Sequence, residues 1–501
     1  EADVMYNFWV KELDCVSCGH TISLLKDYRV ASGRFEDDGK YYVLCPDCET
    51  VTLTDDWHEE SQCHQCNHKF VPENGQVTRG GYYNCPECGQ KESVTDGIAE
   101  QGTPQQRLYA VEYYCEECDQ QGLEKSSYKG YKSPDPADKK LVQDAKQEWE
   151  TRTDLHEYVP DEKVPEGAIT AASSISGNDV FQHGIEYWTD MFNERQLLNI
   201  AKMMKAIEEI DGEAGDYLLL ALSDSLLSYN LLTMYNYSAN KVESALARMK
   251  AFPPQNDMIE GNLWGTEFGR GSFRNIWDMV IRGVEYANAP TERYVEDGET
   301  RETSEFAQPI GKGSEVYQGD MRLIDATNEY DAVITDPPYY DNIIYSEVAD
   351  YFYVWQKILL EDKYPGFDQE KTPRAESIVT NPYLGQTAED FEHEMGEALA
   401  VINKALKSDG TLAFTYHHSD EESWGELLES LCNNNFEVTA TYPINSDLTK
   451  FISGEAVAFD IAIVALPTDD RQPFSWRRLR IDIMNRLEEI QESLQEHRDL
   501  S

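Results

Sequence analysis

The pattern of apolar and polar positions changes twice along the chain. Residues 1–125 contain short apolar runs between polar turns, such as Tyr41–Leu44, which predicts a region of short strands. Apolar positions then recur at helical spacing over residues 191–290. From residue 314 onward, short apolar runs alternate with helical segments. Such alternation is typical of an α/β fold with a doubly wound sheet.

Polar stretches separate these regions. Residues 126–190 contain four prolines and predict a linker with one polar helix, Lys139–Arg152. Residues 291–312 are acidic and polar, which predicts a loop. Residues 471–501 end the chain, with a charged helix predicted over residues 476–499.

Residues 191–290 predict a helical subdomain. Asn193-Glu-Arg-Gln196 resembles a capping box, in which the first and last of these residues exchange hydrogen bonds at the start of a helix. Apolar residues follow at helical spacing. A second, largely buried helix is predicted over Asp216–Met234, and a third over Ile276–Tyr286.

Residues 305–470 predict the α/β region. The strand Tyr330–Thr335 has an apolar centre and is predicted to be buried. Further strands are predicted at Glu315–Gln318, Gly410–Tyr416, Phe436–Tyr442 and Phe459–Leu466. Helices are predicted at Phe391–Leu406 and Glu422–Asn433.

The composition adds a strong negative charge. Ninety-three acidic residues outnumber 43 basic ones, for a formal net charge of −50. The acidic residues are dispersed, which suits a cytoplasm of molar salt, where screening over a few ångströms removes self-repulsion. We interpret the chain as halophilic, with an ordinary acidic protein as the alternative. Hydrophobic residues make up 40% of the chain, which excludes a wholly disordered protein.

Location and partners follow in part from the same data. No apolar run is long enough to span a membrane, and no leader sequence is evident, so we expect a cytoplasmic protein. The chain begins at Glu1 rather than Met, which suggests that it starts inside a longer gene product. Lysine and arginine are too sparse for a basic groove. That argues against nucleic-acid binding at low salt, but much less at molar salt, where counterion release contributes little.

Ten of the 11 cysteines form five Cys-x-x-Cys pairs in the first 118 residues. The pairs are Cys15/Cys18, Cys45/Cys48, Cys63/Cys66, Cys85/Cys88 and Cys115/Cys118. Cysteines at this spacing form a knuckle that directs two thiolates at one tetrahedral ion. Several such pairs in a cytosolic chain indicate structural zinc rather than disulfides. Cys432 stands alone in an apolar helical pattern and is interpreted as a core residue.

Five pairs do not divide into whole four-cysteine sites. Either His58, His64 or His68 completes one site, or a sixth pair lies upstream of Glu1. Histidines in such loops are more often surface residues than ligands. The sequential pairing that follows from an upstream pair joins Cys45/Cys48 with Cys63/Cys66, Cys85/Cys88 with Cys115/Cys118, and Cys15/Cys18 with the upstream pair.

The chemical centre is Asp336-Pro337-Pro338-Tyr339, which follows the strand Tyr330–Thr335. Open α/β sheets bind ligands at the carboxyl ends of their strands. An exocyclic amino nitrogen is a poor nucleophile because its lone pair is delocalised into the ring. The Asp336 carboxylate and the Pro337 carbonyl can accept its two N–H groups, and the prolines hold these acceptors rigidly. Tyr339 offers a face on which a flipped base can stack, so the motif predicts in-line methyl transfer from a sulfonium donor.

The surroundings of the motif favour this function over a simple turn. An apolar strand precedes it, Tyr340-Asp341-Asn342 extends it, and Gly319-Asp320 ends the preceding predicted strand at the same edge. His417 and His418 follow the Gly410–Tyr416 strand near that edge, where an exposed loop position is the simpler interpretation.

The sequences TDPPYYDNI (335–343) and YSEVADYFYVW (345–355) resemble the adenine-specific DNA methylase family that contains a zinc ribbon. The similarity extends over the cysteine region, FNERQLL (192–198), NIWDMV (275–280) and LAFTYHHSDEESWGELL (412–428). The resemblance implies a Rossmann-like class I methyltransferase sheet that uses S-adenosylmethionine, with a zinc-ribbon insert over residues 1–125 and a helical subdomain.

The resemblance also implies roles for single residues. Asp336, Pro337 and Tyr339 would hold the target base, with Tyr340 and Asn342 lining the same pocket. Asp320 would accept a hydrogen bond from the adenine amino group of the methyl donor. The family's phenylalanine- and glycine-rich donor-binding loop has no counterpart here. Because Gly269-Arg-Gly271 and Gly311-Lys-Gly313 follow no convincing apolar strand, we expect that loop upstream of Glu1.

We therefore expect a DNA adenine-N6 methyltransferase, or the larger part of one, that takes a flipped adenine from double-stranded DNA. Its partners would belong to a modification or defence system, and its zinc-binding insert would position nucleic acid or a partner. Methylation of guanine N2 in RNA or tRNA is one alternative. A zinc-ribbon binding module with an inactive methyltransferase fold is another.

Overall fold

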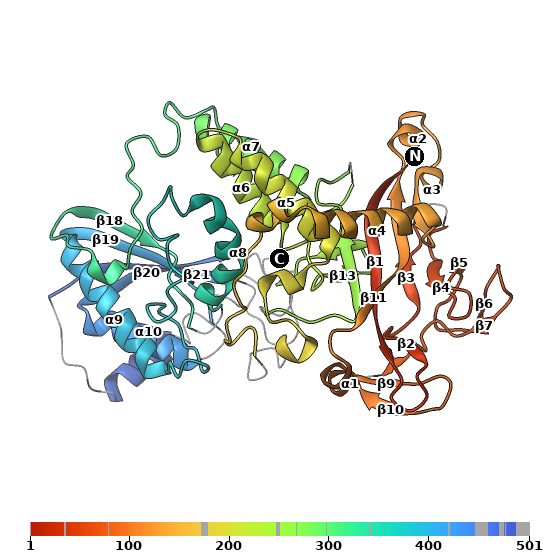
Figure 1. Ribbon diagram of the computed structural model, residues 1–501. Coiled ribbons are helices and arrows are strands. Elements are labelled where there is room, and N and C mark those ends of the chain that lie inside the picture. The colour runs from red at the N-terminus through yellow and green to blue at the C-terminus, as the bar shows by residue number, and fades with distance from the viewer. Residues whose placement is uncertain are drawn as a thin grey trace. The chain divides into compact units, whose positions relative to one another are not determined.

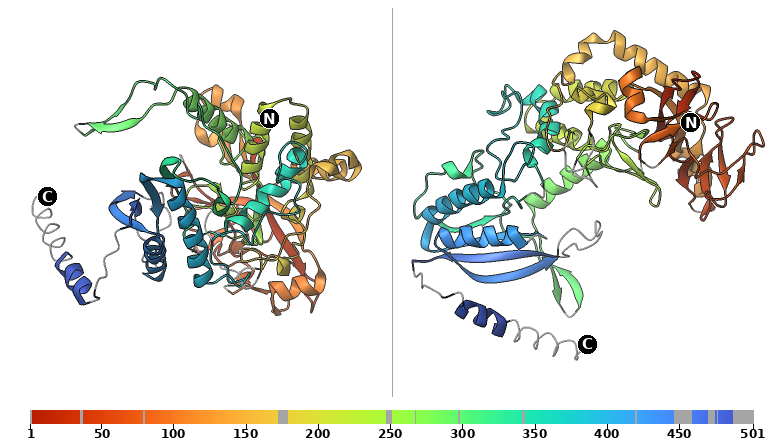
Figure 2. Two further views of the ribbon diagram at one scale, coloured as in Figure 1. Left: turned by 90° about the vertical axis from the view of Figure 1, so that its left-hand side faces the viewer. Right: turned by 90° about the horizontal axis from the view of Figure 1, so that it is seen from below.

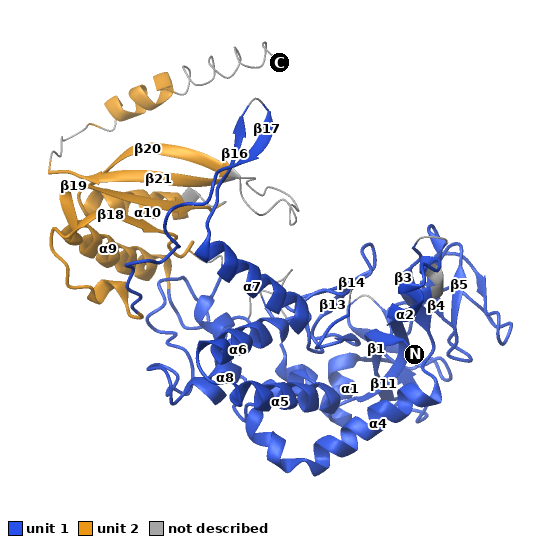
Figure 3. Cartoon of the chain, turned by 90° about the horizontal axis from the view of Figure 1, so that it is seen from above, with its two compact units in different colours: residues 1–317, 343–386 blue, residues 318–342, 387–501 orange. Residues whose placement is uncertain are grey.

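A computed structural model gives a mixed α/β protein that divides into two compact units (Figure 3). Unit 1 contains residues 1–317 and 343–386, and unit 2 contains residues 318–342 and 387–501. The predicted α/β region, residues 305–470, is therefore shared between the two units. The residues that the structure describes are 2–34, 37–78, 80–171, 179–246, 251–266, 268–296, 298–340, 343–418, 421–445, 459–469, 475 and 477–486.

The centre of unit 1 is a five-stranded antiparallel sheet (Figure 1). Its order is β12–β11–β1–β15, and β2 pairs with the end of β1. The strands are β1 (Asp3–Asp14), β2 (Thr21–Ser23), β11 (Gln105–Tyr114), β12 (Lys129–Lys132) and β15 (Asp257–Gly261). Strand β1 has neighbours on both edges, and the run from Met5 to Val10 is buried on both faces of the strand.

Three of the cysteine pairs lie in the turns of small antiparallel hairpins beside this sheet, whereas Cys15/Cys18 lies between β1 and β2 and Cys115/Cys118 follows β11. The predicted strand Tyr41–Leu44 is confirmed as β4. The other strands here are β3 (Arg29–Ser32), β5 (Val51–Thr54), β6 (Ser61–Gln62), β7 (Lys69–Phe70), β8 (Val77–Thr78), β9 (Tyr82–Asn84) and β10 (Lys91–Ser93). The short helix α1 (Val94–Gln101) connects β10 to β11, and α2 (Glu116–Gln120) and α3 (Lys125–Tyr128) lie between β11 and β12.

Longer helices complete unit 1. They are α4 (Pro136–Thr151), α5 (Glu194–Glu208), α6 (Glu213–Ser225), α7 (Phe273–Asn288) and α8 (Tyr345–Leu360). The capping box at Asn193 is confirmed, since the Asn193 and Gln196 side chains each accept the other's backbone N–H. No helix in the described part of the chain is long and apolar enough to cross a membrane.

Helix α6 ends at Ser225, short of the predicted Met234. The reason is local: the buried Asn230 side chain donates to the carbonyls of Leu226 and Leu227 and accepts the N–H of Leu232. These bonds replace helical ones with a turn. Two short hairpins follow, formed by β13 (Met234–Asn236) with β14 (Lys241–Glu243) and by β16 (Arg293–Glu296) with β17 (Glu299–Glu302). The second hairpin lies in the predicted loop 291–312.

Residues 126–190, the predicted linker, contribute to the core of unit 1. The 3₁₀ helices η2 (Thr153–Tyr158), η3 (Phe181–His183) and η4 (Trp188–Met191) lie in this segment. Leu155, Ile169 and Trp188 are almost completely buried, in the same apolar cluster as α5 and α8. The segment 126–190 is therefore packed into unit 1 and is not a linker. The polar helix predicted within it is α4.

Unit 2 is a four-stranded sheet with helices α9 (Ala388–Ala405) and α10 (Glu421–Asn433) packed against each other and against its strands (Figure 2). Its strands, in spatial order, are β18 (Tyr330–Thr335), β19 (Leu406–Tyr416), β21 (Phe459–Pro467) and β20 (Phe436–Asn445). Strands β18 and β19 are parallel, whereas β21 runs antiparallel to both of its neighbours. The sequence predicted each of these elements to within a few residues.

Three expectations for this part of the chain are wrong. Strand β18 is exposed instead of buried, with Ile334 82% exposed, because β19 is its only neighbour among the described strands. Residues Glu315–Gln318 are not a strand. Cys432 is exposed on α10 rather than in the core. Of the predicted C-terminal helix, residues 477–486 are helical, and the remainder lies outside the described residues.

Candidate functional site

The motif Asp336-Pro337-Pro338-Tyr339 lies at the carboxyl end of β18, beside the end of β19. The parallel register pairs Thr335 with Phe414, which brings Thr415 of β19 next to Asp336. The hydroxyls of Tyr339 and Thr415 both donate to Asp336 Oδ1, and the two hydroxyl oxygens lie 2.8 Å apart. Burial raises the pKa of Tyr339, and its bond to Asp336 raises it further, so the phenol stays protonated.

Two acceptors of the motif remain open. Asp336 is exposed, and both hydroxyls bind the same oxygen, so Oδ2 has no partner among the described residues. No described group donates to the carbonyl of Pro337 either. The two prolines fix the local backbone, which holds these acceptors in place without a hydrogen-bonded ladder. The motif thus presents one carboxylate oxygen and one carbonyl oxygen to a ligand.

Aromatic rings surround the motif. The ring of Tyr339 meets Tyr416 edge-on, with centroids 5.4 Å apart. Tyr340 has a left-handed backbone (φ +56°), and its ring contacts Phe391 and His418, each at 5.3 Å. Tyr340, proposed from sequence as a pocket residue, therefore lies beside the motif, whereas Asn342 lies outside the described residues.

Neither histidine that follows β19 is exposed. His417 Nδ1 lies 3.1 Å from Asp460 Oδ1, and the His417 side chain is only 13% exposed. The His418 ring packs against Tyr340, and its carbonyl accepts the indole N–H of Trp424. The antiparallel neighbour β21 supplies Asp460, which the sequence pattern does not reveal.

Asp320 lies in unit 2, immediately before η5 (Met321–Leu323). Both of its carboxylate oxygens bind the Arg322 guanidinium, at 2.7 to 3.1 Å. These bonds lower the pKa of Asp320, so it is ionised at neutral pH. Asp320 Oδ1 also accepts the backbone N–H of Arg322 at 2.9 Å, so Arg322 makes four contacts with this carboxylate, which offers about four lone-pair positions.

Eight of the cysteines form two four-cysteine clusters in unit 1. Cys15, Cys18, Cys85 and Cys88 make one, and Cys45, Cys48, Cys63 and Cys66 make the other, with all sulfurs of a cluster within 4.8 Å. The closest sulfurs are 3.5 to 3.6 Å apart. Four thiolates around a zinc ion at about 2.3 Å would be separated by roughly 3.8 Å, so both clusters have the size of a four-cysteine zinc site.

The pairing differs in part from the sequential one. Cys45/Cys48 does join Cys63/Cys66, but Cys85/Cys88 joins Cys15/Cys18 rather than Cys115/Cys118. The ribbon that contains Cys45–Cys66 is thus inserted between the two halves of the ribbon formed by Cys15/Cys18 and Cys85/Cys88. A small apolar core explains this, because Leu13, Ile22 and Tyr83 pack with both Cys15 and Cys85.

The three histidines considered as ligands are not part of either cluster. His64 Nδ1 lies 2.8 Å from the Thr52 hydroxyl, His58 lies near Glu73, and His68 stacks on Phe70. These contacts agree with the simpler interpretation, in which histidines of such loops serve the protein surface and local packing.

Cys115 and Cys118 form a knuckle that has no second pair among the described residues. The Asp119 N–H donates to the Cys115 carbonyl (3.1 Å), as the Gly19 N–H does to that of Cys15 (2.8 Å). In the other four knuckles, the N–H of the first cysteine donates to the carbonyl of the residue five positions later. The Cys115 N–H instead donates to the carbonyl of Tyr128. The fifth pair therefore has the backbone form of a zinc knuckle with only two thiolates.

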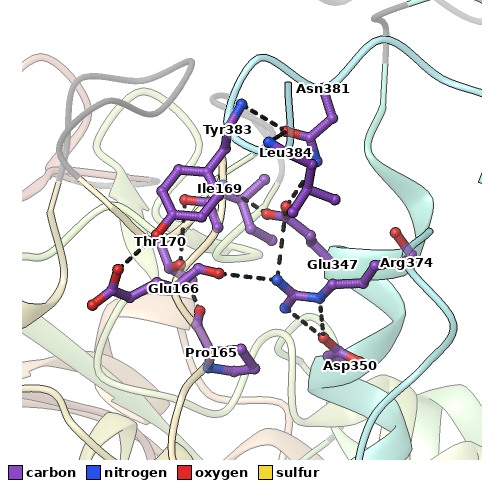
Figure 4. A network of polar contacts seen from close by, with 12 residues as sticks. Pro165, Glu166, Ile169, Thr170, Glu347, Asp350, Arg374, Asn381, Tyr383 and Leu384 are labelled. Carbon is purple, nitrogen blue, oxygen red and sulfur yellow. Dashed lines mark hydrogen bonds and ion pairs between the residues drawn. The ribbon is translucent and has the colours of Figure 1, made fainter. Parts of the chain in front are cut away.

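The residues that follow the motif in sequence form a buried polar network in unit 1 (Figure 4). Glu347 and Asp350 of α8 are each 1% exposed. Arg374 binds Asp350 at 2.6 and 3.1 Å and lies 3.8 Å from Glu347. Glu347 also accepts the Ile169 N–H and the Asn381 amide, both at 3.0 Å. The network joins α8 to the segments around residues 169 and 381.

Comparisons with known proteins add little. No family model matches the chain, and no curated protein matches it. Among solved structures, the chain is similar to a TehB-like SAM-dependent methyltransferase from Corynebacterium glutamicum, with 18% identity over 30% of this chain and 54% of that one. The TM-score is 0.15, which does not establish a common fold.

Proposed function

We propose that this chain carries the base-binding part of an S-adenosylmethionine-dependent methyltransferase that acts on N6 of adenine in DNA. The observation that carries the proposal is the pair of open acceptors, Asp336 Oδ2 and the Pro337 carbonyl, on a proline-fixed turn at the end of β18. An exocyclic amino group has two N–H donors, and this pair would hold both.

The surrounding residues support the same chemistry. The hydroxyls of Tyr339 and Thr415 fix the orientation of the Asp336 carboxylate by binding its other oxygen. When both N–H groups are held by acceptors, the nitrogen lone pair, which lies perpendicular to the plane of the amino group, is left facing the methyl donor. The N–C bond then forms as the S–C bond of the sulfonium breaks, and the nitrogen loses one proton to solvent past the exposed carboxylate.

The sheet of unit 2 supports a class I methyltransferase fold as part of this proposal. The parallel pair β18 and β19, with α9 in the connection between them, is the unit from which doubly wound sheets are built. Ligands of such sheets bind beyond the carboxyl ends of the strands, where the motif lies. Asp320, at the start of η5, is the proposed contact for the methyl donor.

The test is methyl transfer by the full-length protein that contains this chain, from labelled S-adenosylmethionine to unmethylated DNA in molar KCl, followed by nucleoside analysis. We expect N6-methyladenine from the wild type and a loss of about 100-fold or more in Asp336→Asn, because a preorganised charge partner of the amino group is removed. Asp331→Asn is the matched control. It changes an exposed carboxylate at the other end of β18, whose pair with Lys407 contributes little to stability.

The same assay separates the alternatives. An RNA substrate that yields N2-methylguanine while DNA remains unmodified would replace adenine with guanine as the substrate. No transfer to DNA or RNA by the full-length protein, together with no binding of the methyl donor, would support an inactive zinc-ribbon module instead.

A further inference from the structure

Unit 1 contains a cavity of about 720 Å³ at the face of its central sheet. Trp9 and Lys11 line it from β1, where alternate residues share a face. His183 of η3 and the first turn of α5, from Asn193, form further parts of the wall. The volume is within the range of small-molecule sites, about 300–1,000 Å³.

Lys11 is unusual among the lining residues. It lies on the central strand and is only 7% exposed. Within the described residues, its ammonium group has neither a hydrogen bond nor an ion pair. Burial lowers the pKa of Lys11 to about 8, so the amine still carries its proton at neutral pH. A buried charge without a counter-ion is costly, and here the charge borders an open cavity.

The acidic groups at this cavity are already engaged. Glu194 binds Lys146 at 2.6 Å, and the Asp190 carboxylate accepts two backbone N–H groups at 2.8 Å. Behind the lining, Glu260 holds the guanidinium of Arg195 at 2.7 and 2.8 Å. The charge of Lys11 is therefore uncompensated by any of them, in a chain whose net charge is −50.

His183 adds a second unpaired polar atom at the cavity wall. Its Nδ1 is buried and has no hydrogen-bond partner among the described residues. Burial and, to a smaller extent, the charge of Lys11 together lower the pKa of His183 to about 4, so the ring is neutral. A neutral imidazole can donate from Nδ1. Lys11 and His183 together thus offer donors, and no acceptor among the described residues uses them.

We propose that this cavity binds a small organic phosphate of nucleotide size, with its phosphate on Lys11 Nζ and His183 Nδ1. The apolar wall formed by Ile185, Leu231 and Met258 would take the organic part. A phosphomonoester has only acceptors at neutral pH, which matches this donor pair. Its source is a free nucleotide or the 5′-phosphate of a nucleic-acid strand. The cavity lies in unit 1 and the proline motif in unit 2, so this proposal stands apart from the proposed function.

Calorimetric titration of the whole protein tests the ligand. AMP is expected to bind, and adenosine and inorganic phosphate are each expected to bind roughly tenfold more weakly or worse, because each lacks one half of the ligand. A 5′-phosphorylated oligonucleotide is compared with its unphosphorylated counterpart. Preference for the phosphorylated strand over AMP assigns the phosphate to a strand end, and preference for AMP assigns it to a free nucleotide. No binding of either would overturn the proposal.

Substitutions test the site. Lys11→Met keeps the length and apolar stem of the side chain and is expected to weaken binding roughly 10- to 100-fold. Lys140→Met, at an exposed position of α4, is the matched control and should bind like the wild type. His183→Leu provides an independent variant with the same expected loss. Unchanged binding in folded Lys11→Met or His183→Leu would rule this cavity out.

Discussion

The hydroxyl of Thr415 shows the limit of motif reasoning for single residues. The four residues of Asp336-Pro337-Pro338-Tyr339 are contiguous, so the sequence alone reveals them. Thr415 lies on another strand, and only the register of β18 against β19 brings its hydroxyl to the Asp336 carboxylate. A signal existed, because both strands were predicted and parallel neighbours end at the same edge of a sheet.

Thr415→Val is expected to lower methyl transfer about tenfold, because it removes one of the two hydroxyls that orient Asp336 while keeping the shape of the side chain. The change should appear in kcat more than in KM, since Thr415 acts through Asp336. Thr415→Ser restores the hydroxyl and should recover most of the activity. Equal rates for the valine and serine variants would show that the hydroxyl does not position the carboxylate.

Lys11→Met is expected to stabilise the protein in the absence of ligand. The fall in the pKa of Lys11 from 10.5 to about 8 corresponds to about 3 kcal/mol of lost stability at pH 7. Because the folded state holds this proton less tightly than the unfolded state, the loss is complete below about pH 8 and disappears toward pH 10.5. Denaturant unfolding at pH 7 and at about pH 9.5 measures it. A gain that is the same at both pH values would exclude the charge as the cause.

At the level of elements, strand β18 shows that a sequence pattern predicts the bounds of a strand but not its burial. The bounds Tyr330–Thr335 were predicted correctly, because apolar β-formers flanked by polar residues define a strand. Burial was predicted wrongly, since it depends on the neighbours of the strand. Within the described sheet, β18 is an edge strand, and Ile334 faces solvent. The composition of a segment specifies its conformation better than it specifies which strands the segment pairs with.

The zinc ribbons show the same division. The spacing of the cysteines predicts knuckles, since the geometry of Cys-x-x-Cys is local. Which knuckles join depends on the apolar contacts of Leu13 and Tyr83, which come from distant parts of the sequence. The histidine alternative and the sequential pairing were therefore equally compatible with the spacing.

Metal analysis of the purified protein is expected to give two zinc ions per chain. Cys85→Ser should reduce the content to one and lower the thermal stability, because a complete four-thiolate site contributes folding free energy. Cys115→Ser should retain both ions, as the control that changes a knuckle with only two thiolates. Loss of an ion in Cys115→Ser as well as in Cys85→Ser would favour the sequential pairing over the nested one.

At the level of the whole molecule, the acidic composition and the buried charges follow different rules. Surface carboxylates are screened by salt, whereas the carboxylates of Glu347 and Asp350 are buried and depend on Arg374. Close packing reinforces this arrangement, since a Cβ atom at Gly167 would lie 2.4 Å from Glu347 Oε2. The sequence 345–355 was recognised only by resemblance, and nothing in its spacing predicts the partner Arg374.

Arg374→Met is expected to lower the free energy of unfolding by about 3–5 kcal/mol, because it leaves two buried carboxylates without their cation. Lys205→Met, which removes an exposed pair with Asp154, is the control and should cost less than about 1 kcal/mol. Denaturant unfolding in the same buffer measures both. Similar small losses in the two variants would mean that the buried carboxylates are neutral or satisfied by their other donors.

The insertion of one four-cysteine cluster into the other predicts an order of assembly for the two expected zinc sites. The inner site needs only the residues from Cys45 to Cys66, whereas the outer site waits until Cys88 has been synthesised and must close a longer loop around the inner ribbon. Since loop closure costs more entropy as the loop lengthens, a metal-bound inner ribbon shortens the free chain that the outer site has to gather. During synthesis, binding of the first ion at the inner site would thus favour formation of the outer site. Chelators would remove the ion of the outer site first.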